Sequence, residues 1–520
     1  MRKLNVVRAI AAGCLVLAAA PAQVGAQTVA SSTKNDTSPP LSSVPAPAAK
    51  AQAAFRKEHR VKRLPPLPTK QAAFADTVLQ TKAPAKLSIG AVDAIEGIGE
   101  GLPGYQVTSF PADTTGAVGT TQYVQWVNTS LAVFDKATKQ TVLGPIDGSI
   151  LWKGFGGNCE NSNDGDPIVL FDRMANRWVF SQFAVSGNPF SQCVAVSTTP
   201  DATGSFHRYE FQYQDFNDYG KFGIWPDGYY STYNMFGANS FLGSKACAFE
   251  REKMIAGNPA RTVCFDVGSA FGGLLPADLD GSAAPPAGSP NYLMNLGGDQ
   301  LNLWKFKLDW SNPSASTFTG PSAIKTAPFV EACKNSKSGA CIVQPQTTVV
   351  LDSLGDRLMY RLAYRNFGTH EALVVNHSVA VGPRAGLRWY EVRDPAGTPK
   401  VHQQGTYAPT ASSRWMGSIA MDKQGNIGVG YTVSGSSIHP SIRLAGRSAS
   451  DPLNKLAVEK TVADATGKGS QKASDRWGDY STLTIDPTDD CSFWYTAQYQ
   501  KDGVNEWHTK ILRFKFNSCQ

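Results

Sequence analysis

The chain has 520 residues, of which 18% are charged and 10% are aromatic, with 48 glycines, 32 prolines and a formal net charge of +7. This turn-rich and aromatic-rich composition is typical of short strands and argues against a fold built from long amphipathic helices. Much of the positive charge lies in the first hundred residues. The net charge is therefore weak evidence for nucleic-acid binding, and no nucleic-acid partner is predicted.

The N-terminus has the pattern of an export signal. Three basic residues precede the apolar run at 10–20, and Gly25-Ala26 offers a cleavage point, so residues 1–26 are predicted to be a signal peptide. No later stretch is apolar over the roughly 18 residues that a membrane span needs. We expect a secreted or periplasmic protein with no transmembrane segment.

Residues 27–100 are rich in Ala, Pro, Ser, Thr and Lys. Such a composition buries too little apolar surface to offset the entropy lost on ordering. We predict a disordered tether or pro-region here, followed by one folded domain at 101–520.

Cysteine usage agrees with export. Apart from Cys14, which lies in the predicted signal, the chain has an even number of cysteines, and no C-x-x-C zinc pattern occurs. Pairing in sequence order is predicted, because each disulfide then closes one local loop. The predicted pairs are Cys159/Cys193, Cys247/Cys264, Cys333/Cys341 and Cys491/Cys519.

From residue 105 onwards the chain repeats one pattern: a polar or Gly-Asp entrance, an alternating apolar strand, a turn and further strands. Seven such groups fill 105–519, at about 59 residues each, somewhat more than the roughly 40–50 of common propeller repeats. Radial stacking would cover both apolar faces of every sheet. The predicted fold is all-β: a β-propeller with seven blades preferred and six or eight as alternatives. A pair of β-sandwiches is the competing architecture.

Three stretches carry a resemblance to a known family. They lie at 165–178, with Gly165-Asp166-Pro167, at 414–447, and at 476–496, with Arg476-Trp477-Gly478-Asp479-Tyr480. They resemble a widespread, poorly characterised family of exported bacterial proteins predicted to be β-propellers. The resemblance implies the fold and export, and it supplies no catalytic residues. A more distant similarity links 199–206 to the Asp-box turns of sialidase-type propellers, with altered spacing and Phe206 in place of Trp.

The candidate site follows from the fold. Residues just before each innermost strand of a propeller meet at one mouth of the central channel, which is the default ligand site. The candidate catalytic carboxylates are Asp166, Asp227, Asp356 and Asp479. The candidate substrate-binding residues are Asp113, Arg414, Trp415, Arg476, Trp477 and Tyr480. Purely structural turn chemistry is the alternative for each aspartate, and a calcium ligand is a third interpretation.

Two functions follow. One is an exported carbohydrate-active propeller that binds, and in the stronger form hydrolyses, a glycan at the channel mouth, since carboxylates and arginines bind sugar hydroxyls and paired carboxylates can cleave glycosidic bonds. The other is a non-catalytic cell-surface or extracellular binding module. No H-E-x-x-H, G-x-S-x-G or Walker pattern is present. Calcium apart, no cofactor is expected, and the expected partner of a monomer is a glycan or another extracellular polymer.

Overall fold

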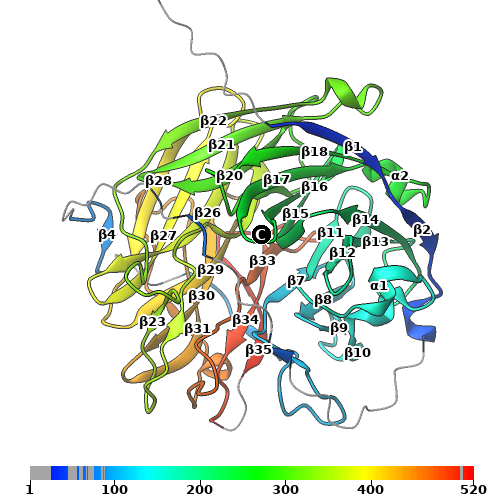
Figure 1. Cartoon of the computed structure of the whole chain (residues 1–520). Coiled ribbons are helices and arrows are strands. Elements are labelled where there is room, and N and C mark those ends of the chain that lie inside the picture. Colours follow the sequence, from blue (N-terminus) through cyan, green and yellow to red (C-terminus); the bar gives the residue numbers. More distant parts are fainter. Residues whose placement is uncertain are drawn as a thin grey trace, which may run out of the picture.

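The computed structural model describes residues 25–44, 56–57, 63–65, 67, 75–82, 86, 88–503 and 507–520. Within these ranges, seven groups of strands radiate from a common axis (Figure 1). The predicted all-β propeller with seven blades is therefore confirmed. The predicted signal peptide lies outside the described residues except for its last two positions, Gly25 and Ala26.

The blades follow one another in chain order. Blade one contains β7 (Thr114–Val118), β8 (Gln122–Val127), β9 (Ser130–Asp135) and β10 (Thr141–Asp147). Blade two contains β11 (Ile168–Asp172), β12 (Arg177–Ala184), β13 (Phe190–Ser197) and β14 (Phe206–Tyr213). Blade three contains β15 (Phe216–Trp225), β16 (Gly228–Phe236), β17 (Phe241–Phe249) and β18 (Arg261–Gly268). Blade four contains β19 (Leu275–Asp280), β20 (Asn291–Gly297), β21 (Gln300–Lys307) and β22 (Thr317–Lys325).

The remaining blades complete the circle. Blade five contains β25 (Met359–Asn366), β26 (Glu371–Val381), β27 (Arg384–Arg393) and β28 (Lys400–Tyr407). Blade six contains β29 (Ser413–Met421), β30 (Ile427–Gly435), β31 (Ile438–Arg447) and the short β32 (Lys460–Thr461). Blade seven contains β33 (Thr482–Ile485), β34 (Ser492–Tyr499) and β35 (His508–Lys515). The first strand of every blade is innermost, and each contacts the first strand of the next blade, with β33 returning to β7.

Helical structure is minor in the described residues. It consists of α1 (Gly157–Asn161), α2 (Arg251–Ile255) and four short 3-10 turns at Leu41–Ser43, Gly148–Trp152, Pro313–Ala315 and Ala463–Ala465. A two-stranded hairpin, β23 (Ala340–Ile342) with β24 (Leu351–Asp352), lies in the connection between blades four and five. Among the described residues, no helix is long and apolar enough to cross a membrane.

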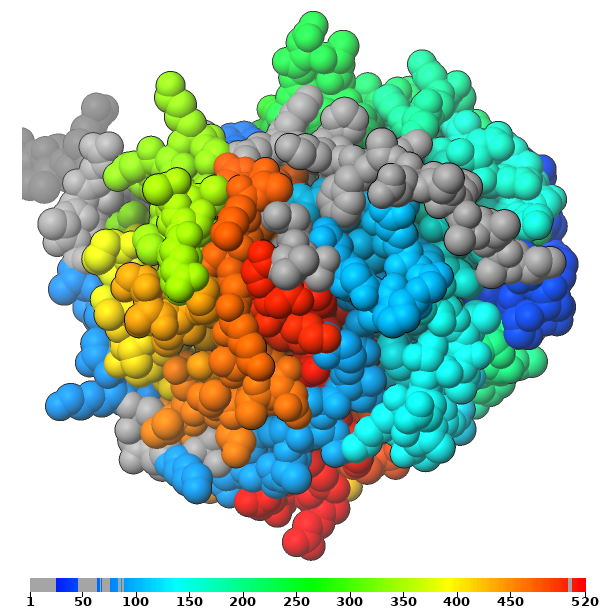
Figure 2. All heavy atoms as spheres, turned by 90° about the horizontal axis from the view of Figure 1, so that it is seen from below, coloured from blue at the N-terminus to red at the C-terminus, as the bar shows by residue number. Residues whose placement is uncertain are grey.

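The ring is closed by an early segment of the chain. The strand β5 (Asp93–Glu96) pairs antiparallel with β35 and supplies the fourth strand of blade seven. Viewed from the rim, early residues in blue lie directly beside the last blade in red (Figure 2). The propeller therefore needs strands from both ends of the folded region to complete its last sheet.

The described parts of 27–100 pack on the propeller, so the prediction of a disordered tether is wrong for them. The strand β1 (Gln27–Ser31) pairs with β18, and β2 (Lys34–Thr37) pairs with β14, each adding a fifth strand to the outer edge of a blade. The short β4 (Leu79–Gln80) pairs in parallel with β28, and β3 (Arg56–Lys57) pairs with β6 (Ser109–Phe110). Edge strands that would otherwise expose unpaired backbone groups are thereby covered.

Aromatic rings against glycines set the spacing between blades six and seven. A side chain at Gly430 would lie 2.4 Å from the Tyr495 ring, and one at Gly428 would lie 2.8 Å from the Phe493 ring. The alternating Gly and apolar residues of β30 therefore leave room for the large residues of β34. Close approach of this kind is what glycine in a strand interior permits.

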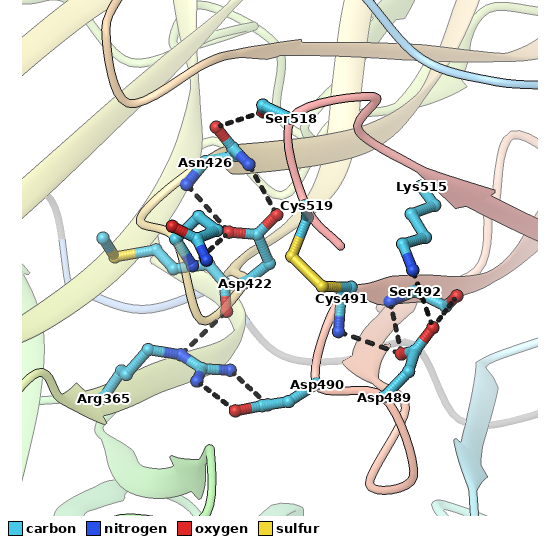
Figure 3. Close-up of a disulfide and its surroundings, with 12 residues drawn as sticks. Arg365, Asp422, Asn426, Asp489, Asp490, Cys491, Ser492, Lys515, Ser518 and Cys519 are labelled. Carbon is cyan, nitrogen blue, oxygen red and sulfur yellow. Dashed lines mark hydrogen bonds and ion pairs between the residues drawn. A yellow bond between two sulfur atoms is a disulfide. The ribbon is translucent and has the colours of Figure 1, made fainter.

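All four predicted disulfides form, at Cys159–Cys193, Cys247–Cys264, Cys333–Cys341 and Cys491–Cys519. The last ties the chain end to the β33–β34 turn (Figure 3). There Arg365 donates two hydrogen bonds of 2.8 Å to the Asp490 carboxylate. Asp422 and Asp486 form hairpin turns, since each carboxylate accepts a backbone N–H two residues on.

Candidate functional site

The entrance ends of the innermost strands bring charged side chains from several blades together. Asp113 precedes β7, Asp166 precedes β11, and Asp479 precedes β33, while Asp218 and Lys221 are the third and sixth of the ten residues of β15. Each is at most 7% exposed. We call these five residues the mouth cluster. Three of them, Asp113, Asp166 and Asp479, are residues that the sequence predicted for this site.

Backbone strain marks the same positions. Asp113 and Asp166 have positive φ angles of 40° and 47°. Tyr219, with a φ of 57°, lies within the register shift of β15 between Asp218 and Lys221. A positive φ is rare for a tyrosine, and such strain is concentrated at functional sites. Here it turns Asp218, Tyr219 and Lys221 towards the mouth instead of continuing the regular strand.

Lys221 is the centre of the mouth cluster and is fully buried. Its Nζ lies 3.5 Å from the ring centroid of Tyr219 and 4.1 Å from that of Tyr480, and it donates a 3.1 Å hydrogen bond to the carbonyl of Gly220. Aromatic faces attract a cation, most strongly where water is excluded. Tyr480, a predicted binding residue, therefore forms one wall of this cage.

Asp479 links three strand entrances. Its backbone N–H donates to Asp113 Oδ1 at 2.6 Å, and its carboxylate accepts from Arg476 Nη2 at 2.9 Å to both oxygens. Its carbonyl accepts from the Tyr219 hydroxyl at 3.3 Å. Arg476, also predicted for the site, thus holds Asp479 in place.

Asp356 lies at the rim of the mouth, before β25. Its carboxylate is paired with the neighbouring Arg357, whose Nε donates to Oδ1 at 2.8 Å. The Arg357 guanidinium carbon in turn lies 4.7 Å from the ring centroid of Tyr219. Arg357 and Tyr219 therefore connect Asp356 to the Lys221 cage.

The two titrating groups of the mouth cluster shift in opposite directions. Burial, reinforced by the negative charge of Asp166, raises the pKa of Asp218 to about 7. Burial lowers the pKa of Lys221 to about 8, against the pull of the surrounding carboxylates. Both shifts follow from the cost of holding a charge away from water. Near neutral pH, Asp218 can therefore donate or accept a proton.

This titration predicts a pH-dependent stability. An unfolded aspartate titrates near pH 3.9, so between about pH 4 and pH 7 the native protein holds a proton on Asp218 that the unfolded chain has released. Stability should therefore fall as pH rises through this window, and Asp218→Asn should flatten the urea-unfolding profile there. Asp166, Asp479, Arg357 and Lys221 are the charged groups that act on this carboxyl.

A matched control uses a turn aspartate at the surface. Asp309 accepts hydrogen bonds from the Ser311 hydroxyl and from the backbone N–H groups of Asn312 and Ser311, and these bonds hold its pKa below the usual value. Asp309→Asn should therefore leave the profile between about pH 4 and pH 7 unchanged. A wild-type profile that is flat across this window would contradict the protonation assigned to Asp218.

Two predicted site residues lie elsewhere, which corrects their assignment. Asp227 lies in the turn between β15 and β16, at the exit end of the innermost strand, where it accepts a 3.0 Å hydrogen bond from the Tyr230 hydroxyl. Burial raises its pKa to about 6. Arg414 pairs with Glu459, at 2.9 Å and 2.7 Å, within blade six. Neither joins the mouth cluster.

Trp415 and Trp477 lie near the mouth but belong to the core. They are 0% and 1% exposed, and their rings pack together with centroids 5.8 Å apart. Both are members of the largest apolar cluster. Their indoles are therefore placed to support the strand entrances, not to stack on a ligand.

The middle of the channel is crossed by two side chains of β25. The Tyr360 hydroxyl donates to the carbonyl of Phe222 on β15 at 2.8 Å. Arg361 donates to Asp278 and Asp280 on β19, at 2.6 Å and 2.8 Å, and to the carbonyl of Leu483 on β33 at 2.7 Å. These contacts separate the mouth cluster from the exit end of the channel.

No metal site is found in the part of the chain that the structure describes. No group of three or more His, Cys, Asp or Glu side chains there has an arrangement that could hold a metal ion. The carboxylates of the mouth cluster are instead balanced by Lys221 and by the neighbouring Arg476 and Arg357.

Comparison with known proteins finds likeness of structure at low identity. The sequence matches no known protein family and no curated protein. The chain is similar to the N-terminal domain of Nup159, at 8% identity and a TM-score of 0.33, over 89% of this chain and 100% of that one. It is also similar to an exo-β-1,3-galactanase from Clostridium thermocellum, at 9% identity and a TM-score of 0.31, over 80% and 88% of the two chains. An α-L-arabinofuranosidase from Podospora anserina gives 11% identity and a TM-score of 0.26, over 57% and 90%. None of these likenesses is close enough to assign an activity.

Proposed function

We propose that the protein is an exported, carbohydrate-active propeller that binds and hydrolyses a glycan at the mouth cluster. The observation that carries this proposal is the convergence of Asp113, Asp166, Asp218 and Asp479 from four blades around Lys221 and two tyrosine rings. Carboxylates recognise sugar hydroxyls, and glycoside hydrolysis needs one protonated and one ionised carboxyl group. The mouth cluster offers both kinds.

Roles within the cluster follow from the contacts. Asp218, protonated near neutral pH, would act as the general acid on the glycosidic oxygen. Asp166 exerts the strongest charge effect on both Asp218 and Lys221, so it is the carboxylate proposed to act opposite Asp218. Asp479, held by Arg476 through both oxygens, would position the others.

Export is part of the proposal. The eight cysteines outside the predicted signal all form disulfides, which persist in oxidising compartments. This supports a secreted or periplasmic location. Membership of the exported bacterial family that the sequence resembles stays a prediction.

A second function, a non-catalytic glycan-binding module, is favoured by a different observation. Asp113 and Asp356 both accept backbone N–H groups, from Asp479 and Leu64, and both are buried. Carboxylates committed in this way stabilise strand entrances without taking part in a reaction. The mouth would then select a glycan and release it unchanged.

One experiment separates the two functions. Two proteins are incubated with a panel of polysaccharides: the intact mature protein and its Leu64→Asp variant, which loosens the contact above Asp356. Reducing ends and bound glycan are measured in the same samples. Hydrolysis predicts that Asp218→Asn and Asp166→Asn each lower turnover about 100-fold or more, the usual loss when a general acid or base is removed. Asp227→Asn, outside the cluster, should keep wild-type turnover.

Each outcome is decisive. Reversible binding with no reducing ends released favours the binding module. Equal turnover in Asp218→Asn and Asp227→Asn would remove Asp218 from catalysis. Failure of both the intact chain and the Leu64→Asp variant to bind or cleave any glycan would contradict a carbohydrate function.

A further inference from the structure

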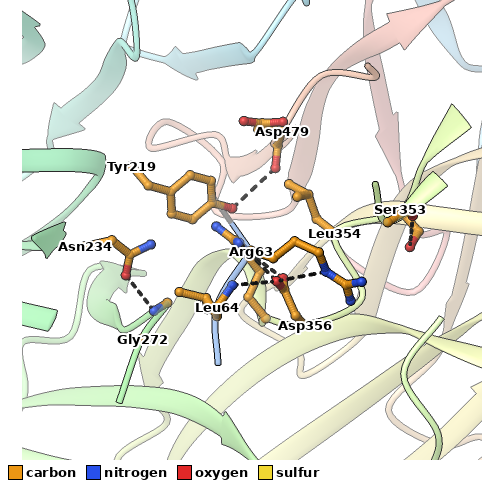
Figure 4. Close-up of polar contacts among 12 residues, drawn as sticks. Arg63, Leu64, Tyr219, Asn234, Gly272, Ser353, Leu354, Asp356 and Asp479 are labelled. Atoms are coloured by element: carbon orange, nitrogen blue, oxygen red, sulfur yellow. Dashed lines mark hydrogen bonds and ion pairs between the residues drawn. The ribbon is translucent and has the colours of Figure 1, made fainter. Parts of the chain in front are cut away.

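A short N-terminal stretch lies on the rim of the mouth, where it contacts Asp356 and Glu331. It consists of Arg63, Leu64, Pro65 and Leu67, which we call the strap. The backbone N–H of Leu64 donates a 3.0 Å hydrogen bond to Asp356 Oδ2. Arg63 donates to the carbonyl of Ser336 at 2.7 Å. Figure 4 shows Arg63 and Leu64 beside Asp356. The strap therefore contacts the same carboxylate that leads to the Lys221 cage.

A second rim carboxylate also receives the strap. Glu331 lies 3.7 Å from the Arg63 guanidinium and accepts a 3.3 Å hydrogen bond from the backbone N–H of Leu67. Glu331 is 3% exposed, and burial raises its pKa. Without the strap, both Glu331 and Asp356 would lose a cation and a backbone donor. The rim is thus chemically complementary to this segment.

The Leu64 side chain fills a niche that is built for it. A side chain at Gly272 would lie 2.5 Å from Leu64 Cδ2, and one at Gly273 would lie 3.0 Å from both Leu64 Cδ1 and Arg357 Cβ. The niche is rigid, because Gly273 N–H donates to Asn234 Oδ1 at 2.9 Å and Asn295 donates to the Gly272 carbonyl at 3.1 Å. Leu64 is 8% exposed there.

The strap is connected to the cage by one chain of contacts. Leu64 binds Asp356, Asp356 pairs with Arg357, and Arg357 lies against the Tyr219 ring whose centroid is 3.5 Å from Lys221 Nζ. The strap itself offers one buried apolar side chain and a few polar bonds. A contact of this size can open locally while the blades stay folded.

We propose that the strap is an autoinhibitory closure of the mouth, and that displacing it exposes the Lys221 cage to a ligand. Control of glycan access by the strap rests on the proposed function, whereas the closure of the mouth does not. Basic residues at 57, 60 and 62 lie immediately before the strap in sequence. Two kinds of agent could release the strap: an acidic polymer that binds these basic residues, or an endoprotease that cleaves next to them.

Accessibility of Lys221 tests the closure without reference to activity. The full chain is treated with a limiting amount of acetic anhydride, and acetylation of Lys221 is followed by peptide mass spectrometry. Leu64→Asp places a carboxylate in the apolar niche at Gly272 and Gly273, so it should release the strap and accelerate Lys221 labelling by about fivefold or more. The matched control is Leu41→Asp, at a buried leucine of the same N-terminal region that packs on blades one and two.

A peptide added in trans distinguishes release from general unfolding. A peptide with the sequence of residues 60–67 should bind the Leu64→Asp protein and restore protection of Lys221, as mass action requires. The same peptide carrying Asp in place of leucine at position 64 should not. Wild-type labelling as fast as that of Leu64→Asp, with both proteins folded by circular dichroism, would overturn the closure, as would equal acceleration by Leu41→Asp.

The readouts separate this inference from the proposed function. Faster labelling of Lys221 in Leu64→Asp, with no glycan bound by either protein, would support the closure and contradict the glycan site. Equal glycan binding by both proteins, with Lys221 labelled equally slowly in both, would support the glycan site and contradict the closure.

Discussion

Replacing Arg361 by Met is expected to lower the free energy of unfolding by about 3–5 kcal/mol, one of the largest losses that a single side chain of this protein can cause. Arg361 is 1% exposed and neutralises Asp278 and Asp280, which are each 4% exposed. Its removal leaves two carboxylates in the channel without a cation, and it also breaks the bond to the Leu483 carbonyl. Urea denaturation measures the loss.

The control for Arg361 is an arginine of the same chemistry at the surface. The Arg513 side chain is 42% exposed and lies 3.4 Å from Asp93, whose side chain is 33% exposed. Exposed pairs of this kind contribute about 1 kcal/mol or less, so Arg513→Met should be nearly neutral. Similar losses for the two variants would show that Arg361 does not hold the channel together.

The second large effect is expected at Lys221. Lys221→Met removes the cation at the centre of the mouth cluster and leaves Asp113, Asp166 and Asp479 to repel one another. We expect a loss of about 3 kcal/mol or more near pH 7, where Lys221 is still mostly protonated, by the same reasoning as for Arg361. The loss should shrink towards pH 5, because protonation relieves the repulsion between carboxylates. Thermal unfolding at the two pH values measures it.

Lys245 supplies the comparison for Lys221. It pairs with Asp266, whose side chain is 49% exposed, on the outer half of blade three. Lys245→Met should therefore cost about 1 kcal/mol or less at either pH. If the loss of stability in Lys221→Met does not depend on pH, its cause is the lost packing against Tyr219 and Tyr480 and not the lost charge.

The architecture could be predicted because each blade repeats a local signal. Turn aspartates such as Asp422 and Asp486, alternating strands and evenly spaced cysteines are all short-range features. The first strands of blades three and four, β15 and β19, were harder to place, because the sequence marks the next strands, β16 and β20, more clearly. In both cases a strong turn signal, such as Pro226-Asp227-Gly228, outweighed a weaker polar strand before it.

The site was harder to predict for the same reason. Asp218 and Lys221 lie inside a strand whose sequence, Phe216-Asn217-Asp218-Tyr219-Gly220-Lys221, does not alternate, and nothing in it marks a positive φ at Tyr219. A run of charged residues just before the apolar Phe222 to Trp225 was the available signal. The strap could not be foreseen, because its contacts with Asp356 and Glu331 join positions more than 260 residues apart.

The pairing of β5 with β35 has a consequence for biosynthesis. Residues 93–96 leave the ribosome more than four hundred residues before their partner strand is made. Until then β5 has no partner strand in its own chain, so its edge is free to pair with a strand of another molecule. Completion of the circle is therefore the final event of assembly, and a chain that ends before residue 508 cannot seal itself.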